Sequence, residues 1–320
     1  MLEISESFGM DSDLFAAGLD PMSITQLILF ILRGRRKSVI NFRGMIKLGH
    51  DARIMDSRLV APYRHSGRVG KNDRNDAEAI CEAVGRPNMR FVPVKSEESQ
   101  AVLTVHRVRE SVVAERTGVA NQMRGLLMEF GIVIPKGLRE LRRTWGEVLK
   151  RHAERLPFLG VEEFRALFAR LLELDARLAE YDRKIARLAR ASEAASRLMR
   201  IEGIGPITAS GVVATVSDAK LFKNGRQFAA WLGLTPRQYS TGGKTRLGRI
   251  SKRGDRYLRT LLVHGARSML LLTAKKLDRK SRWAEGLKAR KPWNKVAVAL
   301  AAKHARILWA MLARGDIYRP

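Results

Sequence analysis

Two adjacent hydroxyl side chains and two glycines precede a run of basic residues in "QYSTGGKTRLGRISKRGDR". Ser240 and Thr241 are followed directly by Gly242 and Gly243. Glycines let a backbone approach a phosphodiester closely, arginines stabilise developing negative charge, and a hydroxyl held there could attack phosphorus covalently. The same hydroxyls could instead bind phosphate or cap a turn without reacting, and the residue types alone favour that simpler interpretation. The residues expected to contact phosphate here are Thr241, Gly242, Gly243, Lys244, Arg246, Arg249, Lys252, Arg253 and Arg256.

This stretch does not match a nucleotide-binding P-loop. Its "GGKT" resembles the end of that motif, but Gln238 stands where a glycine is required before Gly243. The sequence therefore predicts no nucleotide cradle.

Two carboxylates form a second candidate site in "GKNDRNDAEAICEAV". Asp73 and Asp76 are three residues apart at the start of a predicted helix, so they project from one face. Such carboxylates can share Mg²⁺, which prefers oxygen ligands together with substrate phosphate. They could instead serve as a helix cap and a first-turn residue stabilised by the helix dipole. A nuclease-type metal site would also need carboxylates from neighbouring strands.

The charge balance indicates a polyanionic partner. The 320 residues contain 60 Lys+Arg against 32 Asp+Glu, a formal charge of +28, and residues 236–320 hold 22 Lys/Arg against 4 Asp/Glu. The apolar run "LILFIL" at 27–32 is too short to cross a bilayer and predicts a buried strand or helix turn, so no membrane partner is expected. Cys81 is the sole cysteine, which excludes an internal disulfide and a cysteine zinc site; it is expected on a buried helix face.

Residues 1–95 mix short apolar runs such as "ARIM" and "RFVPV" with Gly and Pro, as in an α/β unit.

Helices are predicted through the middle of the chain. A helix is expected from Glu97 to about Phe130. Between 164 and 188 an a/d heptad pattern follows, which suits either a helical hairpin with the 97–130 helix or an intermolecular coiled coil. The seam consists of Phe164, Leu167, Leu171, Leu174, Leu178, Tyr181, Ile185 and Leu188.

A glycine turn in "IEGIGPITA" separates this helical region from the C-terminal part. Gly203 and Gly205 lie between two predicted helices, and Pro206 takes the first helical position of the second. The pattern resembles a helix-hairpin-helix motif, which would bind a backbone phosphate at a helix start; an ordinary turn is the alternative. The rest is predicted to be a compact helical domain. Its tryptophans are expected in cores or interfaces rather than as base-stacking platforms: Trp231, Trp283, Trp293 and Trp309.

Several segments occur in an order that closely resembles the insertion-sequence 110/116/902 family of bacterial transposases. They include "KNDRNDAEAICEAV", "ANQMRGLLMEFGIVIPKG", "IEGIGPITA" and "FKNGRQFAAWLGLTPRQYSTGGKTRLGRISKRGDRYLRTLLVHGARS", within a resemblance over about residues 47–320. The resemblance implies an N-terminal RuvC-like domain with a DEDD carboxylate set, an assembly coiled coil and a C-terminal domain with a nucleophilic serine. It also implies Mg²⁺-dependent strand exchange through a covalent serine–DNA intermediate, directed by a bridge RNA, in a cytoplasmic, nucleoid-associated bacterial protein.

The motif matches assign roles by resemblance. Asp73 and Asp76 match the final two acids, and Ser240 matches the nucleophile, with Thr241 as the register alternative. Asp11 in "FGMDSD" matches the first acid only in part, and the second acid has no counterpart, so the N-terminal domain is expected to be shortened.

The predicted fold class is therefore α/β plus all-α. An incomplete RuvC-like, RNase H-like domain is expected at 1–95, linker helices and a coiled coil at 96–195, and a helical domain with the helix-hairpin-helix and serine motifs at 196–320. Two functional hypotheses remain open: an active transposase that uses metal-bound carboxylates and Ser240, or an inactive relic that retains DNA or RNA binding and assembly. A RuvC-like resolvase without a serine step is a more distant third.

Overall fold

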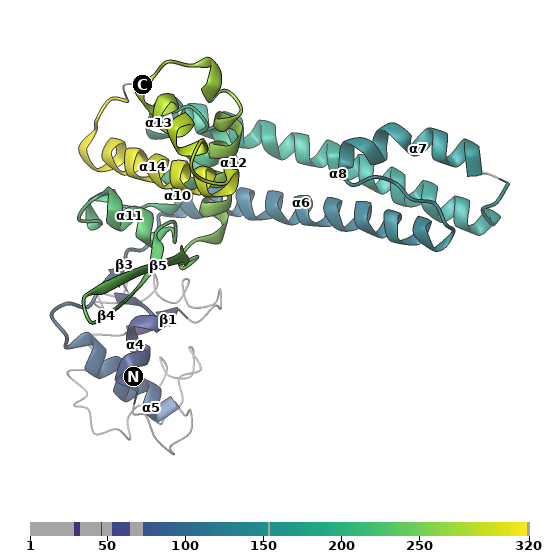
Figure 1. The fold of residues 1–320 in the computed structure, drawn as a ribbon. Helices are drawn as coiled ribbons and strands as arrows, with labels where there is room; N and C mark the ends of the chain where they lie inside the picture. Colours follow the sequence, from purple (N-terminus) through teal and green to yellow (C-terminus); the bar gives the residue numbers. More distant parts are fainter. Residues whose placement is uncertain (1–28, 33–45, 47–52, 65–72, 153, 319–320) are drawn as a thin grey trace. The chain divides into compact units, whose positions relative to one another are not determined.

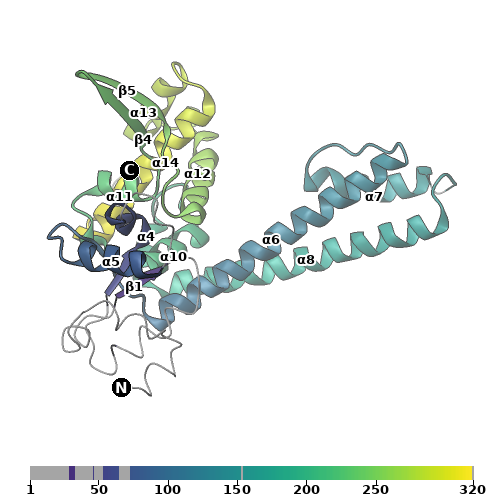
Figure 2. The same ribbon diagram turned by 90° about the horizontal axis from the view of Figure 1, so that it is seen from below.

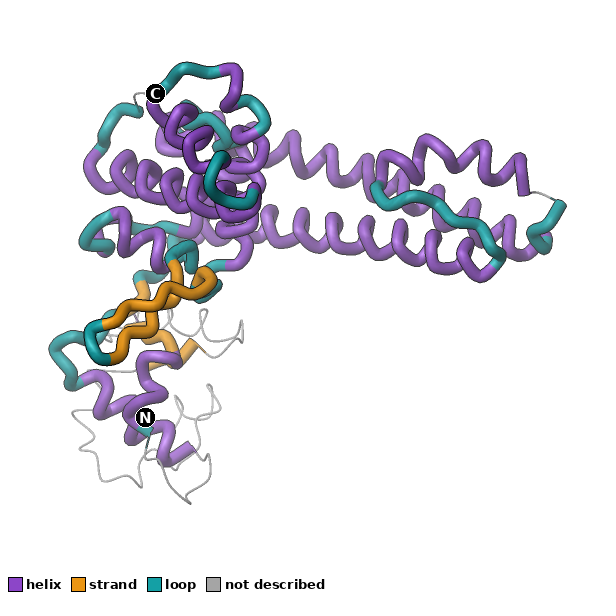
Figure 3. Tube along the Cα trace, in the orientation of Figure 1, coloured by secondary structure: helices purple, strands orange, loops and turns teal. Residues whose placement is uncertain are grey.

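The computed structural model describes residues 29–32, 46, 53–64, 73–152 and 154–318. It is mostly helical, with two small sheets, and it divides into two compact units, Met1–Val94 and Lys95–Pro320. Figure 1 labels the elements along the chain, and Figure 3 distinguishes the helices from the strands.

The first unit contains a three-stranded sheet with short helices. β1 (Leu29–Leu32) pairs in parallel with β2 (Arg53–Asp56), which pairs antiparallel with β3 (Phe91–Val92). β2 and β3 confirm the strands predicted from "ARIM" and "RFVPV", and β1 is the strand of the two alternatives given for "LILFIL". The other elements of this unit are α4 (Ser57–Val60), η2 (Ala61–Tyr63) and α5 (Asp73–Val84).

The packing of α5 corrects one prediction. Ala79 and Ala83 are one helical turn apart and are buried against Met55 and Val60. Cys81 lies two residues from each of them, on the other side of the helix, and is exposed rather than buried.

Three helices of the second unit form an arm. They are α6 (Glu97–Glu129), α7 (Leu138–His152) and α8 (Phe158–Ala191). Ser96 caps α6 by accepting a hydrogen bond from the backbone N–H of Ser99 at 3.1 Å, as its sequence position favours. α6 and α8 lie side by side in both Figure 1 and Figure 2.

The predicted heptad seam of α8 is buried within the same chain. Phe164 and Leu171 pack with Met123 and Leu127 of α6, and Leu174 and Leu178 pack with Val112. Ion pairs follow the same antiparallel register: Arg109 meets Asp182 at 2.5 Å and Arg116 meets Asp175 at 3.2 Å. Of the two arrangements that the heptads allowed, the intramolecular hairpin is present; an additional intermolecular coiled coil stays a prediction.

The remaining helices of this unit surround one apolar core. They are α9 (Glu193–Leu198), α10 (Pro206–Thr215), η3 (Ala219–Leu221), α11 (Gly225–Trp231), α12 (Arg256–Leu270), η4 (Thr273–Lys275), α13 (Arg279–Lys288) and α14 (Trp293–Arg314). Phe228, Leu262 and Leu300 are fully buried in this core. Trp309 is buried too and donates its indole N–H to the carbonyl of Ala219 at 3.0 Å.

Trp283 and Trp293 differ from the core tryptophan, because 37% and 40% of their surfaces are exposed. Among the described helices, α14 alone is long and apolar enough to cross a membrane by length and composition. Half of its most apolar window is nevertheless buried inside the structure, in the way that a core helix is buried.

Candidate functional site

The stretch around Ser240 is a β-hairpin. β4 (Pro236–Thr241) pairs antiparallel with β5 (Lys244–Ile250). Gly242 and Gly243 form the two-residue turn, with φ of 54° and 75°. Positive φ at both central positions is the type I′ geometry that matches the twist of paired strands. The prediction that this part of the chain is purely helical is therefore wrong here. Paired glycines between residues such as Tyr239, Thr245 and Ile250 were the available signal.

The hairpin separates the two candidate hydroxyls. Side chains alternate between the faces of a strand, so Ser240 and Thr241 project in opposite directions. Ser240 pairs with Thr245 across the ribbon, whereas Thr241 pairs with Lys244. The Gln238 side-chain amide, on the same face as Ser240, donates a hydrogen bond to the Ser240 hydroxyl at 2.8 Å.

Two basic residues of the hairpin lie on the face opposite Ser240. Lys244 and Arg246 share the face of Thr241, whereas Arg249 lies in β5 beside a register shift opposite Pro236 and Gln238. All residues of β4 are exposed, so both faces are accessible to a large ligand. Lys252 and Arg253 are exposed in the loop after β5, and Arg256 is exposed at the start of α12.

Backbone contacts fix the base of the ribbon on the helical core. The Ser251 N–H donates to the Thr235 carbonyl at 2.9 Å, and the Lys252 N–H donates to the Gly233 carbonyl at 3.2 Å. The Arg259 guanidinium donates to the Leu232 carbonyl at 3.0 Å. Figure 2 shows the paired strands projecting from the helices that anchor them.

The glycine turn before α10 packs tightly against α12. Gly203 has φ 84°, and a Cβ on it would lie 2.6 Å from the Gly265 carbonyl oxygen. A Cβ on Gly265 would lie 1.8 Å from the Gly203 carbonyl oxygen, so both positions exclude any side chain. Gly205 is the exposed N-cap residue of α10, with open space around it and Pro206 at the first helical position, as predicted.

A buried hydrogen-bond chain links α10 to the arm. Ser210 donates its hydroxyl proton to the Pro206 carbonyl at 2.7 Å, so it must accept from His106 Nε2 at 3.0 Å. His106 Nδ1 then accepts from the Tyr257 hydroxyl at 2.8 Å. Burial lowers the pKa of His106 to about 4 and raises the pKa of Tyr257 to about 12, so this chain holds both groups neutral. The sequence alone gave no signal for these three residues, because they are at least 47 positions apart along the chain and meet only in the folded structure.

The candidate carboxylates lie in the first unit. α5 begins at Asp73, whose side chain lies outside the described part of the structure, as does the whole of Asp11. Asp76 forms an ion pair with Arg64, with 2.8 Å between its carboxylate and Nε, although the two groups are not aligned as a hydrogen bond. Among the described residues, no group of three or more His, Cys, Asp or Glu side chains could hold a metal ion.

Comparison with known proteins gives the family. A model described as "Transposase IS116/IS110/IS902 family" matches residues 195–281, and a DEDD-type model described as "Transposase" matches residues 35–132. A "Probable family 20 transposase" of Pseudomonas aeruginosa is 51% identical over 279 residues, which cover 87% of this chain and 82% of the relative. The chain belongs to the IS110/IS116/IS902 family of transposases.

Other members of this transposase family support the same assignment. The "Transposase for insertion sequence element IS1328" of Yersinia enterocolitica is 41% identical, with 86% of this chain and 81% of the relative covered. The "Transposase for insertion sequence element IS1111A" of Coxiella burnetii is 39% identical, with coverage of 87% and 76%. The family resemblance inferred from the sequence motifs is thus confirmed.

Proposed function

We propose that this transposase catalyses strand exchange at an insertion sequence, with the Ser240 hydroxyl as the nucleophile. The observation that supports this role is the position of Ser240 on an exposed ribbon, where Gln238 donates to its oxygen and leaves its proton free. Thr241 lacks that partner and projects from the opposite face, together with Lys244 and Arg246. Ser240 is therefore the better nucleophile candidate, and Thr241 the better phosphate contact.

The proposed step exchanges one phosphate ester for another. The Ser240 Oγ–phosphorus bond forms as the bond between phosphorus and one bridging DNA oxygen breaks. The serine proton passes to solvent, and the released oxygen takes a proton to become a free hydroxyl. Gln238 is neutral and cannot remove the proton, so its contribution is to orient the serine oxygen.

Basic groups around the hairpin would hold the DNA. Arg249 is exposed near the base of β5, where its guanidinium would pair with a phosphate of the bound DNA. Lys252, Arg253 and Arg256 continue the positive surface toward α12. The N-terminus of α10 at Gly205, which no side chain caps, supplies a further phosphate contact of the helix-hairpin-helix kind.

The family resemblance extends the proposal to partners and location. It implies a structured guide RNA alongside DNA, action at the bacterial nucleoid in the cytoplasm, and a homo-oligomer that assembles through the α6–α8 arm. Exposed apolar side chains near the end of that arm, including Val133, Phe158 and Leu159, suit such an assembly.

We propose Mg²⁺ binding only at the carboxylates of the first unit. Among the described residues, Asp76 offers a single carboxylate, and this carboxylate is paired with Arg64. Mg²⁺ requires more oxygen ligands than one carboxylate supplies. Asp73 and Asp11 would have to complete the site, where the ion would act as a Lewis acid on the phosphate. The RuvC-like character of this unit is proposed on the same basis.

The alternative function is an inactive relic that retains nucleic-acid binding and assembly. The Arg64–Asp76 pair favours it, because a guanidinium already neutralises the Asp76 carboxylate and would compete with a metal ion for it. The two proposals differ in one measurable product, the covalent protein–DNA adduct.

That adduct tests the proposal. Incubation of the full chain with its element DNA should give an adduct that survives denaturing electrophoresis, and Ser240→Ala should abolish it. Thr241→Ala is the matched control on the opposite face and should leave the adduct in place. Adduct formation by Ser240→Ala but not by Thr241→Ala would move the nucleophile to Thr241. No adduct from any protein, including the unaltered chain, would favour the relic.

A further inference from the structure

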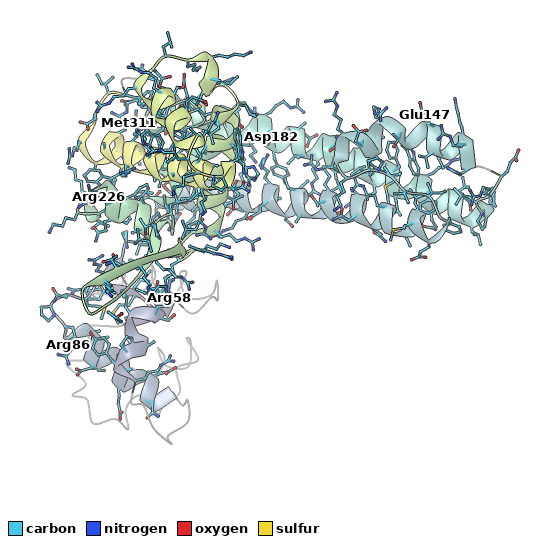
Figure 4. All side chains as sticks on the ribbon, viewed as in Figure 1. Arg58, Arg86, Glu147, Asp182, Arg226 and Met311 are labelled. Carbon is cyan, nitrogen blue, oxygen red and sulfur yellow. The ribbon has the colours of Figure 1, made fainter. Side chains whose placement is uncertain are left out.

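A groove between α13, α14 and the residues after α14 is not used by the proposed strand exchange. We call it the α13–α14 groove; its volume is about 670 Å³, and it is lined by Trp283, Lys303, Arg306, Met311, Ile317 and Tyr318 among others. Figure 4 labels Met311 within this helical region. The volume falls within the roughly 300–1,000 Å³ of sites for small organic molecules, so it suits a nucleotide rather than a base-paired duplex.

Cationic groups crowd this groove, and among the described ones around Lys303 only Lys280 has a carboxylate partner, Glu202 at 3.6 Å. Among the described residues, no ion pair is formed by Arg279, Lys303 or Arg306. Burial lowers the pKa of Lys303, and the nearby charges of Arg306, Arg279 and Lys280 lower it further. Asp278 acts in the opposite direction, and Asp316 also lines the groove, but the cations outnumber these acids. A bound anion would relieve the mutual repulsion of the cations.

Aromatic rings accompany the cations. Trp283 is 37% exposed, and the Lys303 ammonium lies 4.4 Å from the centroid of its ring. The Tyr318 ring is held in place by Lys280, which donates to its hydroxyl at 2.5 Å and lies 5.1 Å from its ring centroid. Ile317, which is 73% exposed, adds an apolar surface. Aromatic faces beside cations are the combination by which proteins bind single-stranded nucleic acid.

We propose that the α13–α14 groove binds one nucleotide of a single-stranded nucleic acid, with its phosphate at Lys303 and Arg306 and its base against Trp283. The groove is thus a contact additional to the β4–β5 hairpin. The inference rests on the proposed function only in taking nucleic acid as the partner.

The test measures affinity of the full chain for labelled single-stranded RNA, single-stranded DNA and duplex DNA by fluorescence anisotropy. Trp283→Ala should weaken single-strand binding about 10-fold, the order of loss of one stacked base, while Trp283→Phe should retain most of the affinity. Lys303→Gln and Arg306→Gln should each reduce the salt slope for single strands by about 0.7, the value for one lost phosphate contact. Lys150→Gln and Arg151→Gln on α7 are the matched controls and should change neither quantity.

Three results would overturn the inference. They are groove variants that bind like the α7 controls, equal losses for single-stranded and duplex DNA, and a Trp283→Phe variant as weak as Trp283→Ala. The melting temperature of each variant shows whether it is folded, and Trp283→Phe provides the comparison if Trp283→Ala unfolds. If the groove variants keep their nucleic-acid affinity while Arg249→Gln loses it, the groove inference is refuted. The proposed function would stand in that case.

Discussion

His106 and His304 are both buried as neutral imidazoles. Burial lowers the pKa of His304 to about 3, with Lys280 and Lys303 adding to the effect, and neither of its ring nitrogens has a hydrogen-bond partner among the described residues. His106 instead sits within the directional chain from Tyr257 to Ser210. Protonation of either ring would bury a positive charge beside other cations, which is costly.

These two histidines predict a loss of stability in mild acid. A folded-state pKa below the unfolded value means that the unfolded state binds more protons. The free energy of unfolding therefore has its full value above about pH 6.5 and decreases as the pH falls toward 4 for His106 and toward 3 for His304. At roughly 1.4 kcal/mol for each pKa unit, the upper limit is about 3.5 kcal/mol for His106 and about 5 kcal/mol for His304. Thermal unfolding across this pH range should show a shallower decline for the His106→Gln, His304→Gln double variant. His264→Gln, at an exposed position, should retain the original decline.

The Arg64–Asp76 pair gives a prediction about Mg²⁺. Arg64→Gln should strengthen Mg²⁺ binding, because it frees the Asp76 carboxylate from a competing cation. Asp76→Asn should weaken or abolish binding, and both effects can be measured by isothermal titration calorimetry. The exposed Arg58→Gln substitution, whose partner is Asp56, is the control and should leave Mg²⁺ binding unchanged. Equal affinities in all three variants would exclude Asp76 as a ligand.

The turn before α10 packs against α12 through two glycines, Gly203 and Gly265. The backbone of Gly203 approaches that of Gly265 in α12 so closely that either Cβ would overlap a carbonyl oxygen. This contact joins the turn to the helix that also carries Tyr257 of the His106 chain. The turn that could bind phosphate is therefore positioned by backbone packing as well as by a polar chain.

We expect Gly203→Ala and Gly265→Ala to destabilise the chain strongly, by about 2–4 kcal/mol, because backbone atoms would have to separate. Gly118→Ala, in the interior of α6 with open space around it, is the matched control and should be neutral or stabilise by up to about 1 kcal/mol. Chemical denaturation measures both effects. A tolerated Gly265→Ala would show that α10 and α12 do not pack this closely.

The whole chain carries far more positive charge than its acids can neutralise. Its formal charge is +28, and residues 236–320 alone hold 22 Lys/Arg against 4 Asp/Glu. Some of these acids also pair with basic residues inside the fold, as Asp175 and Asp182 do in the arm. The excess cations are therefore available to a polyanion.

Nucleic-acid binding should accordingly be strongly salt-dependent. Binding through about 6–10 phosphate contacts predicts that the duplex DNA affinity falls roughly 10³- to 10⁵-fold between about 50 and 200 mM salt. Replacing Lys244, Arg246 and Arg249 together with Gln should reduce the slope of log affinity against log salt by about 2–3, which anisotropy titrations would measure. A nearly flat salt dependence of the unaltered chain would contradict binding through its basic surface.

Much of this architecture follows from local sequence signals. The three- and four-residue spacing of apolar side chains predicted α6 and α8, because each helix must bury one stripe. Gly205 and Pro206 predicted the start of α10. The β4–β5 hairpin was missed, although "TGGK" between alternating residues carries its signal, because the helical patterns on both sides favoured a purely helical domain.

The sequence by itself determined the helical periodicity, the excess of positive charge and the motif order that identifies the transposase family. Tertiary structure decided which cation holds Asp76 and why Gly203 and Gly265 can bear no side chain. It also decided that Trp283 lies in a basic groove rather than in the core. The physical reason is distance along the chain: periodicity and caps act over a few residues, whereas these partners meet only when separate elements pack together.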